Sequence, residues 1–544
     1  MHLLPFGAAL PAHPRAHPGL PLPPTPFAVA KLRPPPVPLF LLTIKIMETL
    51  DDLLSCSVLS FLNGADLLTA GSVCKMFRAL SPIAAKQRLR RINRARLSGG
   101  HRPATISASN AHTLCVREAD GITYAWGGNT DGDGSLTPLA LGVSCGEDQT
   151  TPCPIVQSAC AGDSVREVAA GGYHSLFLTD SGRIFIAGST LVIDNRDESL
   201  RLVRLPRSMQ IVQVACGAFH CLALTDEGSL LSWGRDSDRG RLGHGLAPPP
   251  DYENFRERNR NGFWDCNKQV RRPRHVTTLK GIPIVEVSAG EDHSLCVSAA
   301  GGLYSWGDWS LGRLGLPLEL PGPEMEYEQR FGIESELERW CSIPRLVVKA
   351  IQFAHVSAGQ KHSLAVSAEG GLYAWGSAKS GQLGNAISGE DEGEDEDEDE
   401  DEQEAALEVR EPTRVEGLPK VVMAAAGGRH SIVLGIEGAV YTFGAGRSGQ
   451  LCLGDWSPRA RPTRLPSFPA SYGPAVEVAA GKETSFIRFG NDVLLVAGSN
   501  LSGQLGCGGP TGWDDGVERG PFVGPTTHSA RPHCQLTPVA VAWP

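Results

Sequence analysis

One short phrase returns seven times along this chain, and such a repeat limits the possible fold more than any single residue does. The phrase joins an apolar run, a Gly-x-x-His group, a second apolar run, an aromatic-Gly pair and often Gly-x-Leu-Gly. Its clearest copy begins at Val287, carries Gly-x-x-His at 290–293 and ends at Leu314-Gly315. A chain built from one repeated phrase is expected to fold into one repeated structural unit.

The histidine position marks each copy of the phrase. Six copies carry histidine there and the last carries threonine: His112, His174, His220, His293, His362, His430 and Thr484. Alternating apolar residues around each slot predict short β-strands with one buried face. A single unit of this kind cannot bury both faces of its sheet, so neighbouring units must stack. We therefore predict an all-β, seven-bladed propeller.

A strand of the form Pro-x-x-Val is expected to begin each unit. It occurs three times before a Gly-x-x-His group, at 273–276, 344–347 and 412–415, and once, as Pro-x-x-Leu at 462–465, before Gly-x-x-Thr. A further copy, Pro538 to Val541, has no such group after it, and the first group, at 106–112, has no such strand before it. We therefore expect the C-terminal strand to complete the first blade, which would close the ring and remove exposed strand edges.

This ordered set of motifs resembles the regulator of chromosome condensation repeat family, whose members form seven-bladed propellers. The resemblance covers residues 104–543, although Ala187-Gly188 and Ala497-Gly498 replace Trp-Gly in two units. The family includes a plant UV-B photoreceptor that needs tryptophans beside the histidine slot. Here the residues beside that slot are Tyr173, Phe219, Asp292, Lys361 and Arg429. A photoreceptor role is therefore not expected.

The repeated histidines are interpreted as structural. A residue that recurs once per blade at one strand start is usually a hydrogen bonder, and slots in different blades cannot converge on one metal. The 14 cysteines show no Cys-x-x-Cys pair and no zinc spacing. Cys216, Cys221 and Cys296 fall at apolar strand positions and are expected to be small core residues. We predict no metal, no cofactor and a reducing, intracellular compartment.

The charge of the chain is concentrated in one tract. Its net charge is −10, and thirteen acidic residues lie between Glu390 and Glu404. Such a tract repels itself, so we expect residues 388–406 to form a disordered insert in the propeller, or alternatively a contact for a basic partner. Residues 1–46 are rich in proline and lack acidic residues; a disordered leader or an upstream extension of a chain starting at Met47 is favoured over a transit peptide. No membrane span is expected, and the location is cytoplasmic, nuclear or both.

Residues 47–97 differ in kind from the repeats. Leu54, Val58 and Leu62 follow helical spacing, and Asp66 is suited to cap a second helix. Three short helices of this size cannot bury much core alone. Part of their apolar surface is therefore expected to bind a partner helix.

The order of residues in this helical module resembles an F-box. The Val-Cys-Lys-x-Phe-Arg ending at 73–78 is the more diagnostic half, whereas the opening Leu50-Asp51 departs from the family's Leu-Pro. An F-box implies docking on an SKP-family adaptor of a cullin ubiquitin ligase; an unrelated helical cap is the alternative. The resemblance implies these adaptor-binding residues: Leu50, Leu54, Val58, Leu59, Phe61, Leu62, Leu67, Leu68, Val73 and Phe77.

The propeller would then receive the target protein. We expect no enzyme, because the chain has no P-loop, no Gly-x-Ser-x-Gly and no paired acid/base motif. Long insertions fall between Leu-Gly and Pro-x-x-Val and should emerge on one face; two of them carry the aromatic and arginine residues that dominate interfaces. The candidate target-binding residues are Phe255, Arg256, Arg258, Arg260, Trp264, Tyr327, Phe331 and Trp340. Alternatively, these loops only cover the propeller.

Two other functions remain open. The founding member of the repeat family is a guanine-nucleotide exchange factor for a small GTPase and sits on chromatin. The acidic tract of this chain opposes nucleic-acid binding. The third interpretation is a non-catalytic propeller scaffold.

Overall fold

The chain divides into two compact units, Met1–Phe77 and Arg78–Pro544, and the computed structural model describes parts of the second. The described residues are 105–128, 141–142, 148–155, 160, 162–188, 200–205, 209–236, 240–245, 269–317, 340–387, 407–508 and 534–544. The predicted leader (1–46), the helical module (47–97) and the acidic insert (388–406) lie outside these residues. Among the residues that the structure describes, no helix has the length and hydropathy that crossing a bilayer requires.

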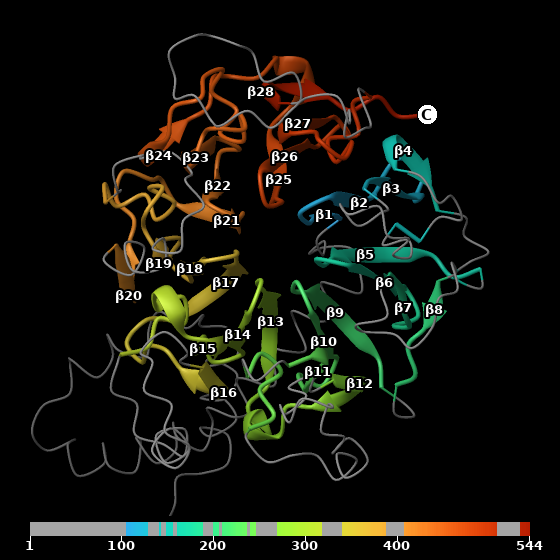
Figure 1. Ribbon diagram of the computed structural model, residues 1–544, viewed down its shortest axis with the longest axis vertical. Helices are drawn as coiled ribbons and strands as arrows, with labels where there is room; N and C mark the ends of the chain where they lie inside the picture. Colours follow the sequence, from blue (N-terminus) through green and yellow to red (C-terminus); the bar gives the residue numbers. More distant parts are fainter. Residues whose placement is uncertain are drawn as a thin grey trace, which may run out of the picture. The chain divides into compact units, whose positions relative to one another are not determined.

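Seven four-stranded antiparallel sheets surround a central axis in the described part of the chain (Figure 1), which confirms the predicted propeller. Blades 1 to 3 consist of β1 (Ile106–Ala108), β2 (His112–Val116), β3 (Thr123–Gly127), β4 (Gln149–Pro154), β5 (Val165–Ala170), β6 (His174–Thr179), β7 (Ile184–Gly188), β8 (Arg201–Leu202), β9 (Ile211–Cys216), β10 (His220–Thr225), β11 (Leu230–Arg235) and β12 (Gln269–His275).

The other four blades follow the same order, from the axis outward. Their strands are β13 (Ile284–Ala289), β14 (His293–Ser298), β15 (Leu303–Asp308), β16 (Trp340–Leu346), β17 (Phe353–Ala358), β18 (His362–Ser367), β19 (Leu372–Ser377), β20 (Glu408–Arg414), β21 (Val421–Ala426), β22 (His430–Gly435), β23 (Val440–Gly444), β24 (Arg459–Arg464), β25 (Ala475–Ala480), β26 (Thr484–Phe489), β27 (Leu494–Ser499) and β28 (Cys534–Ala540). The described residues also include the short 3₁₀ helices η3 (Thr277–Leu279), η4 (Ser310–Gly312) and η5 (Ala470–Tyr472).

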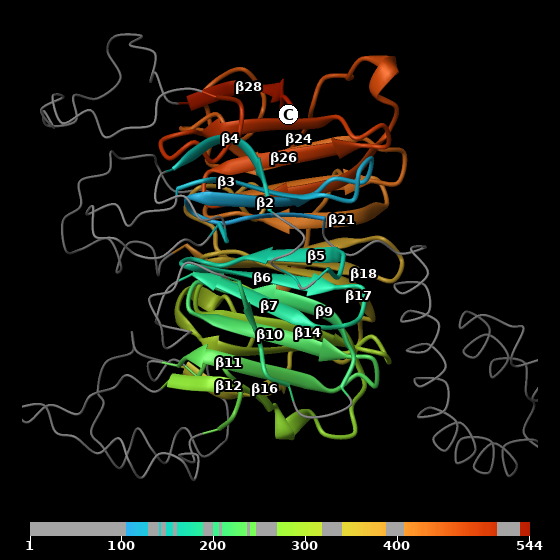
Figure 2. The same ribbon diagram turned by 90° about the vertical axis from the view of Figure 1, so that its right-hand side faces the viewer.

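The core lies between adjacent blades. The second strand of each blade is buried along its whole length, as in β10 and β14, because a neighbouring blade covers each face. Figure 2 shows β2, β6 and β10 stacked in this way. One cluster joins Leu222 and Leu224 of blade 3 to Ile284, Val287 and Trp306 of blade 4. The prediction of strands with one buried face is therefore wrong for these second strands, because neighbouring blades cover both of their faces.

The predicted closure of the ring was wrong. The strand carrying Pro-x-x-Val is the outermost strand of its own blade, so it ends a unit rather than beginning one. β28 therefore pairs with β27 and completes the seventh blade. The first blade takes its fourth strand from β4, where Pro152 and Ile155 carry a form of the same motif and the Ile155 amide donates to the Thr123 carbonyl, as the Val276 amide does to Leu230 in blade 3.

Side chains close the ring instead of a shared sheet. Figure 1 shows β1 beside β25, and a carboxylate of blade 7 links them: Glu477 accepts a hydrogen bond from the Thr105 amide at 2.9 Å. Arg488 donates to Glu477 at 2.9 Å and pairs with Glu118 of blade 1. Trp543, near the C-terminus, packs against aromatic rings of blade 1. The first and last blades thus meet through polar and aromatic contacts.

Candidate binding face at the central channel

The repeated histidines connect each blade to the next. His220 Nε2 lies 2.8 Å from Ser294 Oγ of the following blade, and His112, His293, His362 and His430 make the same contact at 2.8–2.9 Å. Ser294 Oγ in turn donates to the Arg241 carbonyl at 3.0 Å, so the imidazole Nε2–H must donate to the serine. The structural interpretation is confirmed for these five histidines.

Burial keeps these histidines neutral. It lowers the pKa of His293 and His362 to about 3 and that of His430 to about 4. The pKa of His220 is also held well below the ordinary value, first by burial and then by the nearby Arg241. Groups with such pKa values stay unprotonated near neutral pH, so they act as hydrogen-bond donors rather than as acids or bases.

The glycine of Gly-x-x-His makes room for two neighbours at once. A Cβ on Gly290 would lie 2.6 Å from His293 Cε1 and 2.4 Å from the Gly359 carbonyl oxygen of the next blade. A side chain on Gly290 would therefore force its own blade and the next one apart at the channel. In the first blade Ser109 takes this position, and its hydroxyl lies 2.9 Å from His112 Nδ1.

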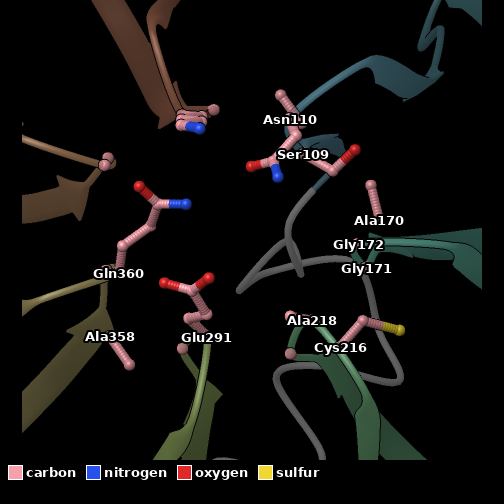
Figure 3. A pocket seen from close by; sticks show the side chains of 18 of the residues that line it. Ser109, Asn110, Ala170, Gly171, Gly172, Cys216, Ala218, Glu291, Ala358 and Gln360 are labelled. Atoms are coloured by element: carbon pink, nitrogen blue, oxygen red, sulfur yellow. The ribbon is translucent and has the colours of Figure 1, made fainter. Parts of the chain in front are cut away.

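The turns that carry this motif meet around one end of the central channel. Three consecutive residues from every blade line the pocket there, and Figure 3 shows Glu291 and Gln360 pointing toward its centre. Its cavity volume is about 110 Å³, which is well below the roughly 300–1,000 Å³ of small-molecule sites. The geometry favours a surface that meets another macromolecule over a pocket that holds a cofactor.

The two residues between glycine and histidine differ from blade to blade, while the frame around them is uniform. We call them the rim residues. They are Asn110, Ala111, Gly172, Tyr173, Ala218, Phe219, Glu291, Asp292, Gln360, Lys361, Gly428, Arg429, Lys482 and Glu483. Because a repeated frame presents variable residues at equivalent positions, the rim is the part of the propeller best suited to specific recognition.

Blades 2 and 3 give the rim an aromatic sector. The Tyr173 side chain is 43% exposed and its ring stacks on Phe219, with the ring centroids 5.6 Å apart. The Arg241 guanidinium lies 5.1 Å from the centre of the Phe219 ring and forms an ion pair with Asp292 at 2.8 Å. The buried Arg241 therefore supports the aromatic pair and joins it to blade 4.

Blades 4 to 7 give the rim charged residues of both signs. Burial, followed by the neighbouring Asp292, raises the pKa of Glu291, and Arg313 opposes that shift. Arg313 also donates to the Gln360 carbonyl at 3.2 Å, which orders the next turn. Lys361, Arg429 and Lys482 follow in blades 5 to 7. The face therefore passes from aromatic to acidic to basic around the channel.

Most residues predicted from sequence to bind partners lie outside the described residues. These are the adaptor set between Leu50 and Phe77 and the target set between Phe255 and Phe331. Trp340 is half-buried at the start of β16, opposite Asp308. β11 ends and β12 begins at the sheet edge where Gly234 pairs with His220, and this is the edge that carries the rim.

Sequence reasoning named five of the rim positions only to exclude a photoreceptor. It did not foresee that Tyr173 and Phe219 would stack, because they are 46 residues apart and belong to different blades. The available signal was the contrast between invariant and varying positions of the repeat. Cys221 and Cys296 are buried as expected, whereas Cys216 is half-buried and lines the channel.

Known proteins share this architecture. The family model of the RCC1-like domain matches residues 86–510. Human E3 ubiquitin-protein ligase HERC2 is 30% identical over 393 residues, which covers 63% of this chain and 7% of HERC2. Ultraviolet-B receptor UVR8 of Arabidopsis thaliana is 28% identical over 405 residues, covering 74% of this chain and 66% of UVR8. The chain thus spans a small part of HERC2 and about two thirds of UVR8.

A solved structure supports the same fold. Prp20p from Saccharomyces cerevisiae, whose structure is reported together with its binding properties to Gsp1p and histones, superposes with a TM-score of 0.53 at 22% identity. The superposition covers 69% of this chain and 80% of Prp20p. At this identity the likeness concerns the fold alone.

Proposed function

Since this chain belongs to the RCC1-like domain family, we propose that its propeller binds a target protein through the rim and serves as the substrate-recognition subunit of a cullin-type ubiquitin ligase. In this proposal residues 47–97 act as an F-box that docks on an SKP-family adaptor, and the ubiquitin chemistry belongs to other subunits. The likeness to the ligase HERC2 supports the ligase context.

The observation that carries this proposal is the composition of the rim. An exposed tyrosine stacked on a second aromatic ring, Tyr173 on Phe219, offers a large and rigid contact area. Tyrosine, tryptophan and arginine supply most of the energy in protein interfaces. The charged rim residues of the other blades, Glu291 and Arg429 among them, add electrostatic selection of the partner.

The long insertions extend the same surface in this proposal. They would contribute Phe255, Arg256, Arg258, Arg260, Trp264, Tyr327, Phe331 and Trp340 to target binding. The insertions attach to blades 3 and 4, which also hold Phe219 and the Arg241–Asp292 ion pair. A target seated on this side of the channel could contact the rim and both insertions together.

Adaptor binding is tested with the full-length protein. Purified SKP-family adaptor should be captured by the wild type and not by the double variant L59D/F61D, because the two carboxylates would have to be buried in an apolar interface. The propeller of the variant should unfold at the same temperature as that of the wild type. Equal capture by both proteins, or capture by neither, would remove the F-box assignment.

The target face is tested by ubiquitination in cells. Y173A and R429E should each reduce the adaptor-dependent ubiquitination of proteins that the wild type captures, while adaptor binding persists. The control I436A removes a side chain that is 64% exposed in the turn after β22, at the end of the strand opposite His430. If I436A and Y173A behave alike, the rim is not the target-binding face.

Nucleotide exchange is the second candidate function. The fold likeness to Prp20p, whose reported properties include binding to Gsp1p, favours testing it. Accelerated release of labelled GDP from a small GTPase by the wild type, with no capture of the adaptor, would replace the ligase proposal. If the protein neither accelerates GDP release nor captures the adaptor, the non-catalytic scaffold is the interpretation that is left.

A further inference from the structure

The boundary between blades 2 and 3 departs from the pattern of the other boundaries. The residue after the histidine or threonine slot is serine or threonine in six blades: Thr113, Ser175, Ser294, Ser363, Ser431 and Ser485. In blade 3 it is Cys221. The five serines contact the histidine of the preceding blade. The last residue of the innermost strand is alanine in the same six blades: Ala108, Ala170, Ala289, Ala358, Ala426 and Ala480. In blade 3 it is Cys216.

These two replacements face one another and a histidine. Cys216 and Cys221 are direct cross-strand partners in β9 and β10. His174 Nε2, from blade 2, lies 3.1 Å from Cys221 Sγ. The two sulfur atoms and a ring nitrogen of His174 all lie within 4.8 Å of one another. Figure 3 shows the Cys216 sulfur pointing away from the centre of the pocket.

We propose that His174, Cys216 and Cys221 bind a zinc ion at this boundary. Two thiolates and an imidazole are a donor set that zinc uses in proteins. Zinc–sulfur and zinc–nitrogen bonds of about 2.3 and 2.0–2.1 Å place tetrahedral donors roughly 3.5 Å apart, which the observed cluster can reach through small side-chain movements. Cys216 is half-buried, and His174 and Cys221 are buried.

This site differs from the sequence prediction of no metal. The prediction rested on spacing, and the three ligands come from two blades and have no compact motif. Three protein ligands leave the fourth position of zinc for water. Zinc would join blades 2 and 3 one residue away from Tyr173, so the metal would also hold the aromatic sector of the rim in place.

The test compares variants that carry, at the two cysteine positions, the residue types found in the other blades. C216A and C221S install the alanine and serine found at these positions elsewhere, so both variants are expected to fold. The control C296A removes another buried cysteine and installs the alanine that Ala223 and Ala365 provide at the equivalent position. Full-length protein is reduced, freed of metal, equilibrated with Zn²⁺ and dialysed, and its zinc content is measured.

The expected result is one more zinc per chain in the wild type and C296A than in the double variant C216A/C221S. Co²⁺ should give a thiolate-to-cobalt absorption band that C221S lacks, and Zn²⁺ should raise the thermal midpoint of the wild type but not that of C221S. Equal zinc content in the wild type and the double variant would overturn the proposal. A Cys216–Cys221 disulfide in a protein that takes up no zinc after reduction would also overturn it.

Discussion

At the scale of single residues, the histidine–serine bonds should account for much of the cohesion between blades. H362A would remove a fully buried imidazole and leave Ser431 without its donor. We expect a loss of about 2–4 kcal/mol, from the cavity and the lost hydrogen bond together. The loss of stability is measured as a shift of the urea unfolding midpoint, with tryptophan fluorescence as the probe. V422A, at a side chain that is 54% exposed, is the control; an equal midpoint in both variants would contradict the prediction.

The same histidines should make stability depend on pH. In the folded protein their pKa values are about 3 to 4, against an ordinary value of 6.5. Below pH 6.5 these histidines are therefore protonated in the unfolded chain but stay neutral in the folded protein. Their contribution is complete above pH 6.5 and is lost as the pH falls toward their folded pKa values, by about 1.4 kcal/mol per pH unit for each histidine.

Urea midpoints between about pH 7 and pH 5 measure this loss, since most carboxylates are still ionised there. In H362Q the urea midpoint should fall less steeply with decreasing pH, because one of the histidines that contribute to the slope is absent. A midpoint that stays constant over this range would show that the histidines accept protons in the folded state.

At the scale of the element, each aromatic-Gly pair should depend on the absence of a side chain. Gly376 has a φ of +110°, and a Cβ there would lie 2.6 Å from the Lys361 carbonyl oxygen. Gly417 also has a positive φ, +81°, but nothing lies within 4 Å of its Cβ position. We expect G417A to cost about 1–2 kcal/mol and G376A clearly more, because strand β19 must shift. Similar unfolding midpoints for the two variants would disprove the steric explanation.

At the scale of the whole molecule, ring closure should depend on one buried arginine. Arg488 is 6% exposed in its side chain and pairs with the equally buried Glu477, which holds blade 1. R488L would leave that carboxylate without its counter-ion and should destabilise the propeller by about 3–5 kcal/mol. R414L is the control, because the Arg414–Glu416 pair is largely exposed and such pairs contribute about 0–1 kcal/mol.

Amide hydrogen exchange locates the effect of R488L. Faster exchange should appear first in β1 and β25, where the two ends of the ring meet. Uniform exchange across all blades would indicate that closure does not depend on this cluster.

Much of the fold could be predicted because the repeat is local. The spacing of Gly-x-x-His around His293 and its neighbours sufficed for the fold class and the blade number, since each strand has its own apolar pattern. The position of blade boundaries could not be predicted. A periodic pattern does not show whether the Pro-x-x-Val strand is the first or the last strand of a blade. Only the pairing of β27 with β28 shows that the C-terminal strand belongs to the seventh blade.

The sequence by itself determined the propeller, the structural role of the histidine slots and the uniform frame around them. Tertiary structure alone decided how the ring closes, which rim residues meet and where three potential metal ligands converge. Tyr173 reaches Phe219, and His174 reaches Cys221, across a boundary between blades. Such contacts depend on how neighbouring sheets stack, and the pattern within one strand carries no information about the residue that the next blade places opposite it.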